Sequence, residues 1–279
     1  MKVYYKPSEL LRPARQKLRD HSVPINGAEW LLMDLFNLSK LDIVMDRSEI
    51  TQEMRGLYEA GVEQLAAGVP LAHITGFQLF YGRPFQVTDD VLVPRPETEE
   101  LVERALAHLG GTVADIGTGS GCIAITLALE ANADVLAVDI SEQALTVAAH
   151  NAEKLGAEVK FLQGDLLEPI IECHIKLDML ISNPPYIAEH EKTIMSDSVL
   201  NYDPHLALFA DDNGLALYKR MIDDLPLVMK DNSIVLFEIG HAQGKALEKY
   251  ITALYPQIDV KIEKDINQFD RIIWFNWCQ

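Results

Sequence analysis

Beyond Glu97, apolar residues at helical spacing alternate with short β-branched runs, and this alternation constrains the fold more than any other feature of the sequence. Helices are expected from Glu97 through Leu109, after Ser120, from Ser141, and at 215–229 and 242–254; strands are expected at 112–117, 133–139, 159–165, 177–183 and 233–240. This order predicts a mostly parallel sheet covered by helices on both faces. Two more strands, near 258–263 and 271–276, have no clear helix between them, so the sheet should end in an antiparallel hairpin.

The chain before this pattern reads differently. From Ser8 to about Ala67 the apolar residues recur at helical spacing, as in Trp30, Leu31, Leu35 and Leu38, which predicts a small helical bundle. Helix starts are expected at Asn26 and Ser48, and the last helix is expected to end at Gly68 and Pro70. Aromatic and β-branched residues around Gly82-Arg83-Pro84 then predict a β-hairpin linker at about 75–95. We therefore expect a helical domain over 1–74 and a second domain, with the linker, over 75–279.

Charge argues against a nucleic-acid substrate. The chain has 24 Lys and Arg against 42 Asp and Glu, a net charge of −18. Residues 1–74 hold 9 basic and 10 acidic residues, a net charge of −1, so 75–279 carry −17. Affinity for a phosphate backbone comes mainly from Lys and Arg that replace condensed counterions, so a DNA or RNA partner is disfavoured.

The sequence also indicates a cellular compartment. The first residues have no apolar signal-peptide core, and no run of about 18 apolar residues follows. Cys122, Cys173 and Cys278 are too far apart for a redox pair or a zinc cluster. We expect a cytoplasmic monomer with reduced thiols and no membrane association.

A glycine-rich loop, Asp115-Ile116-Gly117-Thr118-Gly119-Ser120-Gly121, lies between the first strand of the alternating pattern and its helix. Open α/β sheets bind ligands at this position, and glycine lets a ligand approach the backbone closely. The spacing is G-x-G-x-G, whereas the dinucleotide fingerprint is G-x-G-x-x-G. A dehydrogenase is therefore the weakest interpretation of the loop.

Acidic residues follow the next two strands. Asp139 ends the second strand and can accept hydrogen bonds from both ribose hydroxyls. Asp165 ends the third strand within reach of an adenine amino group, with Leu166 as a wall for the ring. Either aspartate alone would be better explained as a turn residue after a strand. Together with Gly117, Thr118, Gly119, Ser120 and Gly121, they indicate an adenosine site without a pyrophosphate, which favours S-adenosylmethionine.

Asn183-Pro184-Pro185-Tyr186 closes the fourth strand, at the same edge of the sheet. The prolines fix the backbone and remove two N–H donors. This leaves acceptors on the Asn183 side chain and the Pro184 carbonyl, beside the aromatic ring of Tyr186. Such a site suits a planar –NH2 group held in line with a methyl donor. A proline-rich turn is common in isolation, but not beside the loop described above.

Other reactive side chains point to no further site. His73, His190 and His205 lack partners at metal-ligand spacing, so no metal is expected. Cys122 has no histidine placed to activate it and is interpreted as a packing residue. The basic cluster of Arg12, Arg15, Lys17 and Arg19 is interpreted as a solvated helix face, with docking of a protein substrate as the weaker hypothesis.

Taken with these motifs, the sequence resembles the HemK/PrmC family, the protein-(glutamine-N5) methyltransferases that modify class I peptide chain release factors. The resemblance spans essentially the whole chain. It rests on the glycine loop and on Pro94-Arg95-Pro96-Glu97-Thr98-Glu99, Asn183–Tyr186, Tyr202-Asp203-Pro204-His205-Leu206-Ala207-Leu208 and Glu238-Ile239-Gly240. The first and third of these four stretches are the most specific, because amino-group DNA methyltransferases share the tetrapeptide.

The resemblance implies a Rossmann-like class I methyltransferase domain behind a helical substrate-recognition domain. It implies methyl transfer from S-adenosylmethionine to the glutamine amide of a Gly-Gly-Gln motif. Cofactor contacts would come from 117–121, Asp139, Asp165, Leu166 and Asn183, and Asn183, Pro184, Pro185 and Tyr186 would hold the glutamine, with Asn183, Pro184 and Tyr186 acting in transfer. Arg95 and Glu97 would fix the loop between hairpin and cofactor rather than react. The family often has an aromatic residue in place of Leu166 and Gly-Gly in place of Ala210-Asp211.

Two alternatives remain open at this point. An N6-adenine methyltransferase acting on DNA or RNA would use the same tetrapeptide on a flipped base, but it would need a basic recognition region. A noncatalytic adenosyl-binding protein would not need the intact acceptor residues at 183–186.

Overall fold

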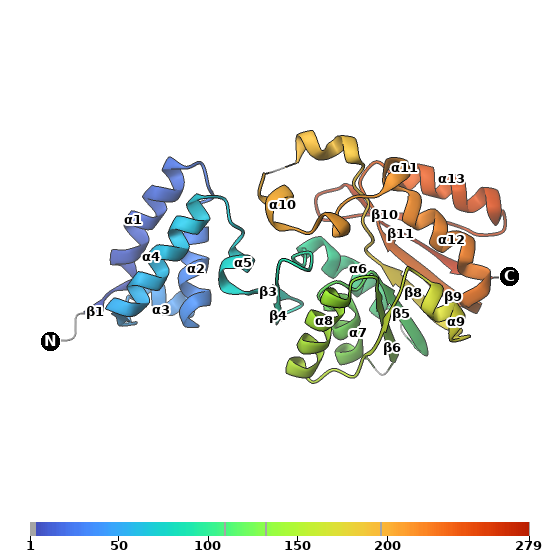
Figure 1. Cartoon of the computed structure of the whole chain (residues 1–279), viewed down its shortest axis with the longest axis horizontal. Coiled ribbons are helices and arrows are strands. Elements are labelled where there is room, and N and C mark those ends of the chain that lie inside the picture. The colour runs from blue at the N-terminus through green and yellow to red at the C-terminus, as the bar shows by residue number, and fades with distance from the viewer. Residues whose placement is uncertain (1–3, 109, 132, 196, 279) are drawn as a thin grey trace. The chain divides into compact units, whose positions relative to one another are not determined.

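The computed structural model describes residues 4–108, 110–131, 133–195 and 197–278 (Figure 1). The chain divides into two compact units. Unit 1 is Met1–Phe77 with Ser196–Tyr202, and unit 2 is Gln78–Met195 with Asp203–Gln279.

Unit 1 is built mainly of helices. Its core packs Leu18, Leu31 and Leu32, all fully buried, around Tyr58, whose hydroxyl donates to the Ala28 carbonyl (2.9 Å). The helices are α1 (Pro7–Asp20), α2 (Gly27–Phe36), α3 (Lys40–Val44), α4 (Gln52–Ala66), α5 (Leu71–Thr75) and α10 (Asp197–Tyr202); β1 (Tyr4–Tyr5) pairs with β2 (Ile50–Thr51). The predicted bundle is confirmed. Trp30, next to Leu31 in sequence, points outward and is 51% exposed.

The helix start predicted at Ser48 is wrong. Residues 50–51 are extended because they pair with β1, so the helix begins only at Gln52. Thr51 is the N-cap, and its hydroxyl accepts a hydrogen bond from the Met54 N–H (3.2 Å). A local serine signal was overridden by strand pairing with a segment far away in sequence.

The predicted hairpin is present, one residue earlier than its sequence signal. β3 (Phe77–Phe80) and β4 (Arg83–Gln86) are joined by Tyr81 and Gly82, both with positive φ (50° and 74°). Two such residues form the tight turn that matches the twist of an antiparallel pair. Arg83 and Pro84 therefore belong to the second strand rather than to the turn.

Within the described residues, unit 2 contains a seven-stranded sheet in the order β10-β11-β9-β8-β5-β6-β7. β9, β8, β5, β6 and β7 run parallel, and β11 and β10 complete one edge as the predicted antiparallel hairpin. The strands are β5 (Thr112–Ile116), β6 (Asp134–Asp139), β7 (Lys160–Gln163), β8 (Leu177–Ser182), β9 (Met229–Glu238), β10 (Lys261–Lys264) and β11 (Asp270–Trp277). β5 pairs with β6 on one side and with β8 on the other. The order of the strands therefore changes direction at β5: β6 and β7 extend the sheet on one side, and β8 and β9 extend it on the other. Ligands bind at such a switch point, beyond the carboxyl ends of the strands.

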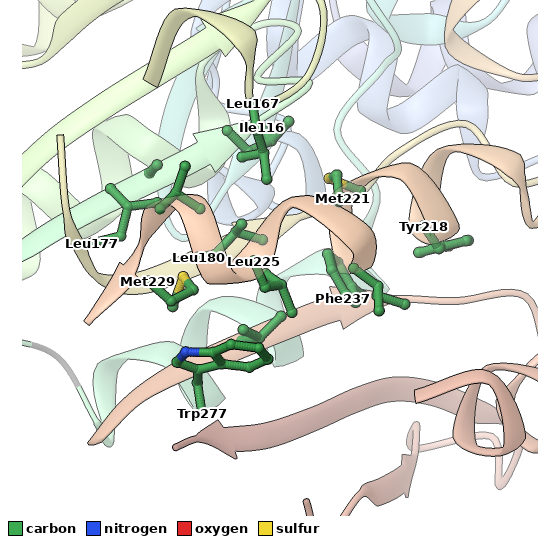
Figure 2. Close-up of a cluster of buried hydrophobic side chains, with 14 of the residues drawn as sticks. Ile116, Leu167, Leu177, Leu180, Tyr218, Met221, Leu225, Met229, Phe237 and Trp277 are labelled. Atoms are coloured by element: carbon green, nitrogen blue, oxygen red, sulfur yellow. The ribbon is translucent and has the colours of Figure 1, made fainter. Parts of the chain in front are cut away.

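Helices cover both faces of the sheet, as the alternation predicts. On one face lie α6 (Pro96–Leu106), α7 (Cys122–Glu130) and α8 (Glu142–Leu155); on the other lie α9 (Glu168–Glu172), α12 (Ala216–Val228) and α13 (Gly244–Leu254). Figure 2 shows Leu225 of α12 beside Phe237 and Trp277 on the strands, and Tyr218 and Met221 of α12 belong to the same buried cluster. Alternate residues of each strand enter opposite cores, as Val113 and Ala114 do. The predicted helix runs through Leu109, which lies outside the described residues; α6 ends at Leu106.

The end of the connection from β8 to α12 is hydrogen-bonded to the beginning of the same connection. It carries η1 (Glu189–Ile194), α10, η2 (His205–Ala207) and α11 (Asp211–Gly214). The Ile187 N–H donates to the Leu208 carbonyl, and the Ala210 N–H donates to the Ile187 carbonyl, both at 3.0 Å. Where the family often has Gly-Gly, Ala210 is extended (φ −139°). The left-handed residues are instead Asp212 and Asn213, just after that pair.

Candidate active site

A cavity of about 400 Å³ lies at the carboxyl ends of the parallel strands in unit 2. Most of the residues predicted for the site line it: Gly117, Thr118, Gly119, Ser120, Asp139, Asp165, Leu166, Asn183, Pro184 and Pro185. Gly121 and Tyr186 are not among the lining residues. Pro94, Arg95, Thr98 and Arg220 also line the cavity, so it includes part of the PRPET segment.

The glycine loop fits closely over the end of β6. The N–H groups of Gly117 and Thr118 both donate to the Val138 carbonyl (2.8 and 3.0 Å). Gly117 and Gly119 have positive φ (73° and 54°), and a Cβ on either would meet no protein atom within 4 Å. Residues with a side chain rarely adopt positive φ, so glycine is favoured at both positions, and no side chain covers the surface of the loop there.

Asp139 is oriented by this loop. Its Oδ2 accepts the Gly119 N–H (2.8 Å), and its Oδ1 accepts the Ser141 N–H (2.9 Å). Burial raises the pKa of Asp139, and the backbone N–H donors oppose that rise. Each carboxylate oxygen keeps a second lone pair, so a vicinal diol can still donate to both.

Asp115, at the base of the loop, is a buried acidic residue to which the sequence pattern assigns no role. Its Oδ2 accepts from the Thr118 hydroxyl (2.7 Å) and the Ala124 N–H (3.2 Å). Its Oδ1 has no hydrogen-bond partner among the described residues. Complete burial raises the pKa of Asp115 to about 7. An unpaired buried acceptor is costly, so this oxygen is suited to a donor supplied by a ligand or water.

Asp165 is not free in the structure. The Arg220 guanidinium, from α12, donates to Oδ1 (3.2 Å) and to Oδ2 (2.7 Å). Leu166 follows with φ 50°, packs at the edge of the core and lines the cavity. Sequence reasoning missed Arg220 because it lies 55 residues from its partner, and no local pattern marks it.

Asn183 is bonded to the PRPET segment. Its Nδ2 donates to the Thr98 hydroxyl (3.2 Å), and that hydroxyl donates to Glu238 Oε2 (2.7 Å). Thr98 and Glu238 are both 2% exposed. The side chain therefore has its amide nitrogen engaged and its Oδ1 unengaged by this chain of bonds.

Tyr186 anchors the end of the tetrapeptide. Its carbonyl accepts from Gln243 Nε2 (2.8 Å), and its hydroxyl accepts from Arg271 (3.5 Å). Burial raises the pKa of Tyr186 to about 12, so the phenol is neutral. A Cβ on Gly214 would lie 1.9 Å from the Tyr186 carbonyl oxygen, so only glycine allows this approach.

The PRPET segment is held to the later YDPHLAL stretch. Arg95 forms an ion pair with the buried Asp203 (2.6 Å), whose other oxygen accepts the Val93 N–H (3.3 Å). In α6, Glu99 accepts the Tyr81 N–H (2.7 Å). These contacts hold segments that are far apart in sequence against each other, and together the segments fix one wall of the cavity.

Other candidate chemistry is not assembled in the structure. Among the described residues, no group of three or more His, Cys, Asp or Glu side chains could hold a metal ion. Cys122 is buried, which raises the pKa of its thiol to about 12 and agrees with a packing role. In the described part of the chain, no helix is both long enough and apolar enough to cross a membrane.

Comparison with known proteins identifies the family. A family model described as the PrmC N-terminal domain matches residues 9–76, and one described as the methyltransferase small domain matches 96–203. The chain is 45% identical to the release factor glutamine methyltransferase of Staphylococcus aureus, covering 90% of this chain and 91% of that one. The Bacillus subtilis enzyme of the same name is 44% identical, with 95% and 96% covered.

Solved structures agree on the fold. A methyltransferase from Pyrococcus furiosus superposes with a TM-score of 0.56 at 16% identity, covering 79% of this chain and 98% of that chain. High identity to the curated relatives over nearly the full length, with the matching fold, establishes the relationship. The chain belongs to the family of release factor glutamine methyltransferases.

Proposed function

We propose that this protein transfers a methyl group from S-adenosylmethionine to the side-chain amide nitrogen of the glutamine in the Gly-Gly-Gln motif of class I release factors. One observation carries the proposal beyond family membership. The bare glycine loop, Asp139 and the Asn183-Pro184-Pro185 segment line a single cavity of about 400 Å³. A donor and an acceptor bound there would meet without any large movement of the fold.

The residues present fit the cofactor. Gly117 and Gly119 offer space that a Cβ would fill, and Asp139 keeps lone pairs for two hydroxyls. We propose that Gly117–Gly121, Asp139, Asp165, Leu166 and Asn183 hold S-adenosylmethionine. When bound, it would supply an electrophilic methyl group on a sulfonium.

The chain's own contribution is orientation of the amide nitrogen. An amide lone pair is delocalised, so the nitrogen is a poor nucleophile unless it is held in line with the methyl group. Asn183 Oδ1 and the Pro184 carbonyl are proposed to accept its two hydrogens. Positioning of this kind can contribute about 7–11 kcal/mol in well-aligned systems. As the N–C bond forms and the methyl–sulfur bond breaks, the methylated nitrogen becomes acidic and releases one proton to water.

Pro185 and Tyr186 complete the proposed glutamine site. Pro185 lines the cavity, and Tyr186 holds the segment through its carbonyl bond to Gln243. We propose that Tyr186 acts by anchoring this segment, since it packs against the core and does not line the cavity. The helical residues 1–74 are proposed to recognise the body of the release factor, which is supported by the family match over 9–76.

Mass spectrometry tests the proposal. The full chain is incubated with S-adenosylmethionine and a class I release factor, and the Gly-Gly-Gln peptide is analysed. The expected result is a mass gain of one methylene group on that glutamine, absent when the glutamine is replaced by alanine. Adenine-containing DNA and RNA serve as parallel substrates. Methylated adenine without a methylated release factor would overturn the proposal in favour of the N6-adenine alternative.

A further inference from the structure

Glu238 is a buried acid that the proposed transfer does not use. It closes β9, is 2% exposed, and receives the Thr98 hydroxyl at Oε2 (2.7 Å). Its backbone carbonyl separately accepts from the Tyr218 hydroxyl (2.6 Å), which fixes the end of the strand. Burying a carboxyl this completely costs free energy unless it is hydrogen-bonded, paired with a charge or protonated.

The direction of each hydrogen bond follows from counting protons. An ionised carboxylate can only accept, so the Thr98 hydroxyl must donate its one hydrogen to Glu238. The same hydroxyl oxygen can then only accept from Asn183, which must present Nδ2 rather than Oδ1. Asn183 Oδ1 is thereby left for the substrate.

Protonation of Glu238 removes this constraint. A neutral carboxyl can donate to Thr98, which frees the threonine hydrogen to point at Asn183. The Asn183 amide can then turn and present its –NH2 to the cavity. Two –NH2 groups facing each other cannot hydrogen-bond through their hydrogens, so the glutamine amide would lose its acceptor.

We infer that Thr98 and Glu238 are positioning residues, which set the orientation of the Asn183 amide so that its oxygen faces the glutamine, with ionised Glu238 as the competent form. The inference rests on the proposed function. Neither residue touches the reacting atoms in this scheme; both act through Asn183.

The surroundings of Glu238 place its titration in the neutral range. Burial raises the pKa of Glu238 to about 7; the Thr98 bond, Arg271 and Arg95 act against that rise, and Glu97 adds to it. Tyr186 and Tyr218, which also face Glu238, have raised pKa values and stay neutral. The ionised fraction of Glu238 therefore changes across pH 6–8, and kcat should rise with pH through about 7.

The test compares Thr98→Val, which replaces the hydroxyl with a methyl group, with Thr98→Ser, which keeps the hydroxyl and loses the methyl group. We expect Thr98→Val to lower kcat about 10- to 100-fold, as loss of an orienting partner does at other sites. Thr98→Ser should keep kcat within about threefold of the parent, and both variants should bind S-adenosylmethionine with a Kd within a few fold of the parent. Thr126→Val is the matched control: Thr126 is equally buried, but its hydroxyl donates to the Cys122 carbonyl within α7 (2.6 Å).

The pH profile separates positioning from a merely structural role. The rise in kcat should be present in the parent chain and in Thr126→Val, and absent in Glu238→Gln. If Glu238→Gln does not fold, the residual activity of Thr98→Val should lack the same rise, because its link to Glu238 is cut. Three results would each overturn the inference. These are an equal loss of kcat in Thr98→Val and Thr98→Ser, a kcat of Thr98→Val like that of the parent, and a kcat of the parent that does not change over pH 6–8. A parent chain that methylates no release factor defeats the proposed function itself, and that result is distinct from all of these.

Discussion

At the residue scale, Asn183 carries the greatest share of the proposed chemistry. Its amide nitrogen is bonded to Thr98, while its oxygen is assigned to the glutamine. Asn183→Ala should keep the Kd for S-adenosylmethionine within a few fold, since the cofactor is held mainly by the loop and Asp139. It should lower kcat at least about 100-fold, because an amide that is not oriented loses most of the positioning advantage. Isothermal titration and a methyl-transfer assay measure the two effects, and turnover like that of the parent would remove the assigned role.

Asp139 should give the opposite result. Asp139→Ala removes the two charge-assisted contacts that we propose to the ribose, each of about 1.5–3 kcal/mol, and also frees the Gly119 and Ser141 N–H groups. The Kd for S-adenosylmethionine should rise at least about 100-fold. Glu142→Ala, next to the same turn at the start of α8, is the control for general disturbance. An unchanged Kd in Asp139→Ala would contradict the ribose contact.

At the element scale, the sequence was most informative where a pattern is local and repeated. The strand runs, the helices around them and the C-terminal hairpin all appear within a few residues of their expected positions. Short segments with no period of their own, such as α9 and α11, were not predicted. Ser48 failed as a helix start because β1 holds residues 50–51 extended, and such a long-range pairing leaves no mark in the local sequence.

The residues of the site also differ in how far the sequence predicts them. The glycine loop, Asp139, Asp165 and the tetrapeptide could be found because each follows a predicted strand, and strand ends meet at one edge of the sheet. Glu238 follows the same rule but was seen only as part of a family motif. Arg220 and Thr98 lie within helices, where neither periodicity nor spacing separates a site residue from an ordinary one.

The glycine loop supports a paired prediction. Gly119→Ala and Gly121→Ala both force alanine into positive φ, at a cost of roughly 1 kcal/mol each. A Cβ on Gly121 also meets Ile125 Cδ1 at 2.7 Å and Ala148 Cβ at 3.1 Å, whereas one on Gly119 meets no protein atom. Thermal unfolding should therefore show Gly121→Ala to be the less stable variant, by about a further 1–3 kcal/mol. Cofactor binding should weaken in Gly119→Ala even where the fold is intact; a lower melting temperature for Gly119→Ala than for Gly121→Ala would contradict this assignment.

At the scale of the whole molecule, stability should depend on pH through the two buried carboxyls. Asp115 and Glu238 have ordinary pKa values of 3.8 and 4.5, and burial raises both to about 7. Between pH values near 4 and near 7, these two carboxyls keep their protons in the folded chain and lose them in the unfolded chain. The free energy of unfolding should therefore fall as pH rises from about 4 to about 7, and change little above that.

Thermal unfolding measured between pH 5 and pH 8 checks this dependence. The parent chain should melt several degrees lower at pH 8, and Glu238→Gln should lose part of that difference. The net charge of −18 acts in the same direction by self-repulsion, so a control that also removes one carboxylate is needed. Glu103→Gln, at an exposed position of α6, serves this purpose. Identical pH dependence in the two variants would show that burial of Glu238 does not contribute.

The glycine just before α12 has a consequence for how the site is lost. Gly214, the last residue of α11, lies directly against the Tyr186 carbonyl, and Arg220 of α12 binds Asp165. The continuous segment from α11 into α12 therefore supports both the proposed glutamine side and the proposed adenine side of the cavity. Fraying of this segment would loosen both sides together. Heat inactivation should then be all-or-none, with methyl-donor binding and methyl-acceptor binding failing at the same temperature and no intermediate state that binds one without the other.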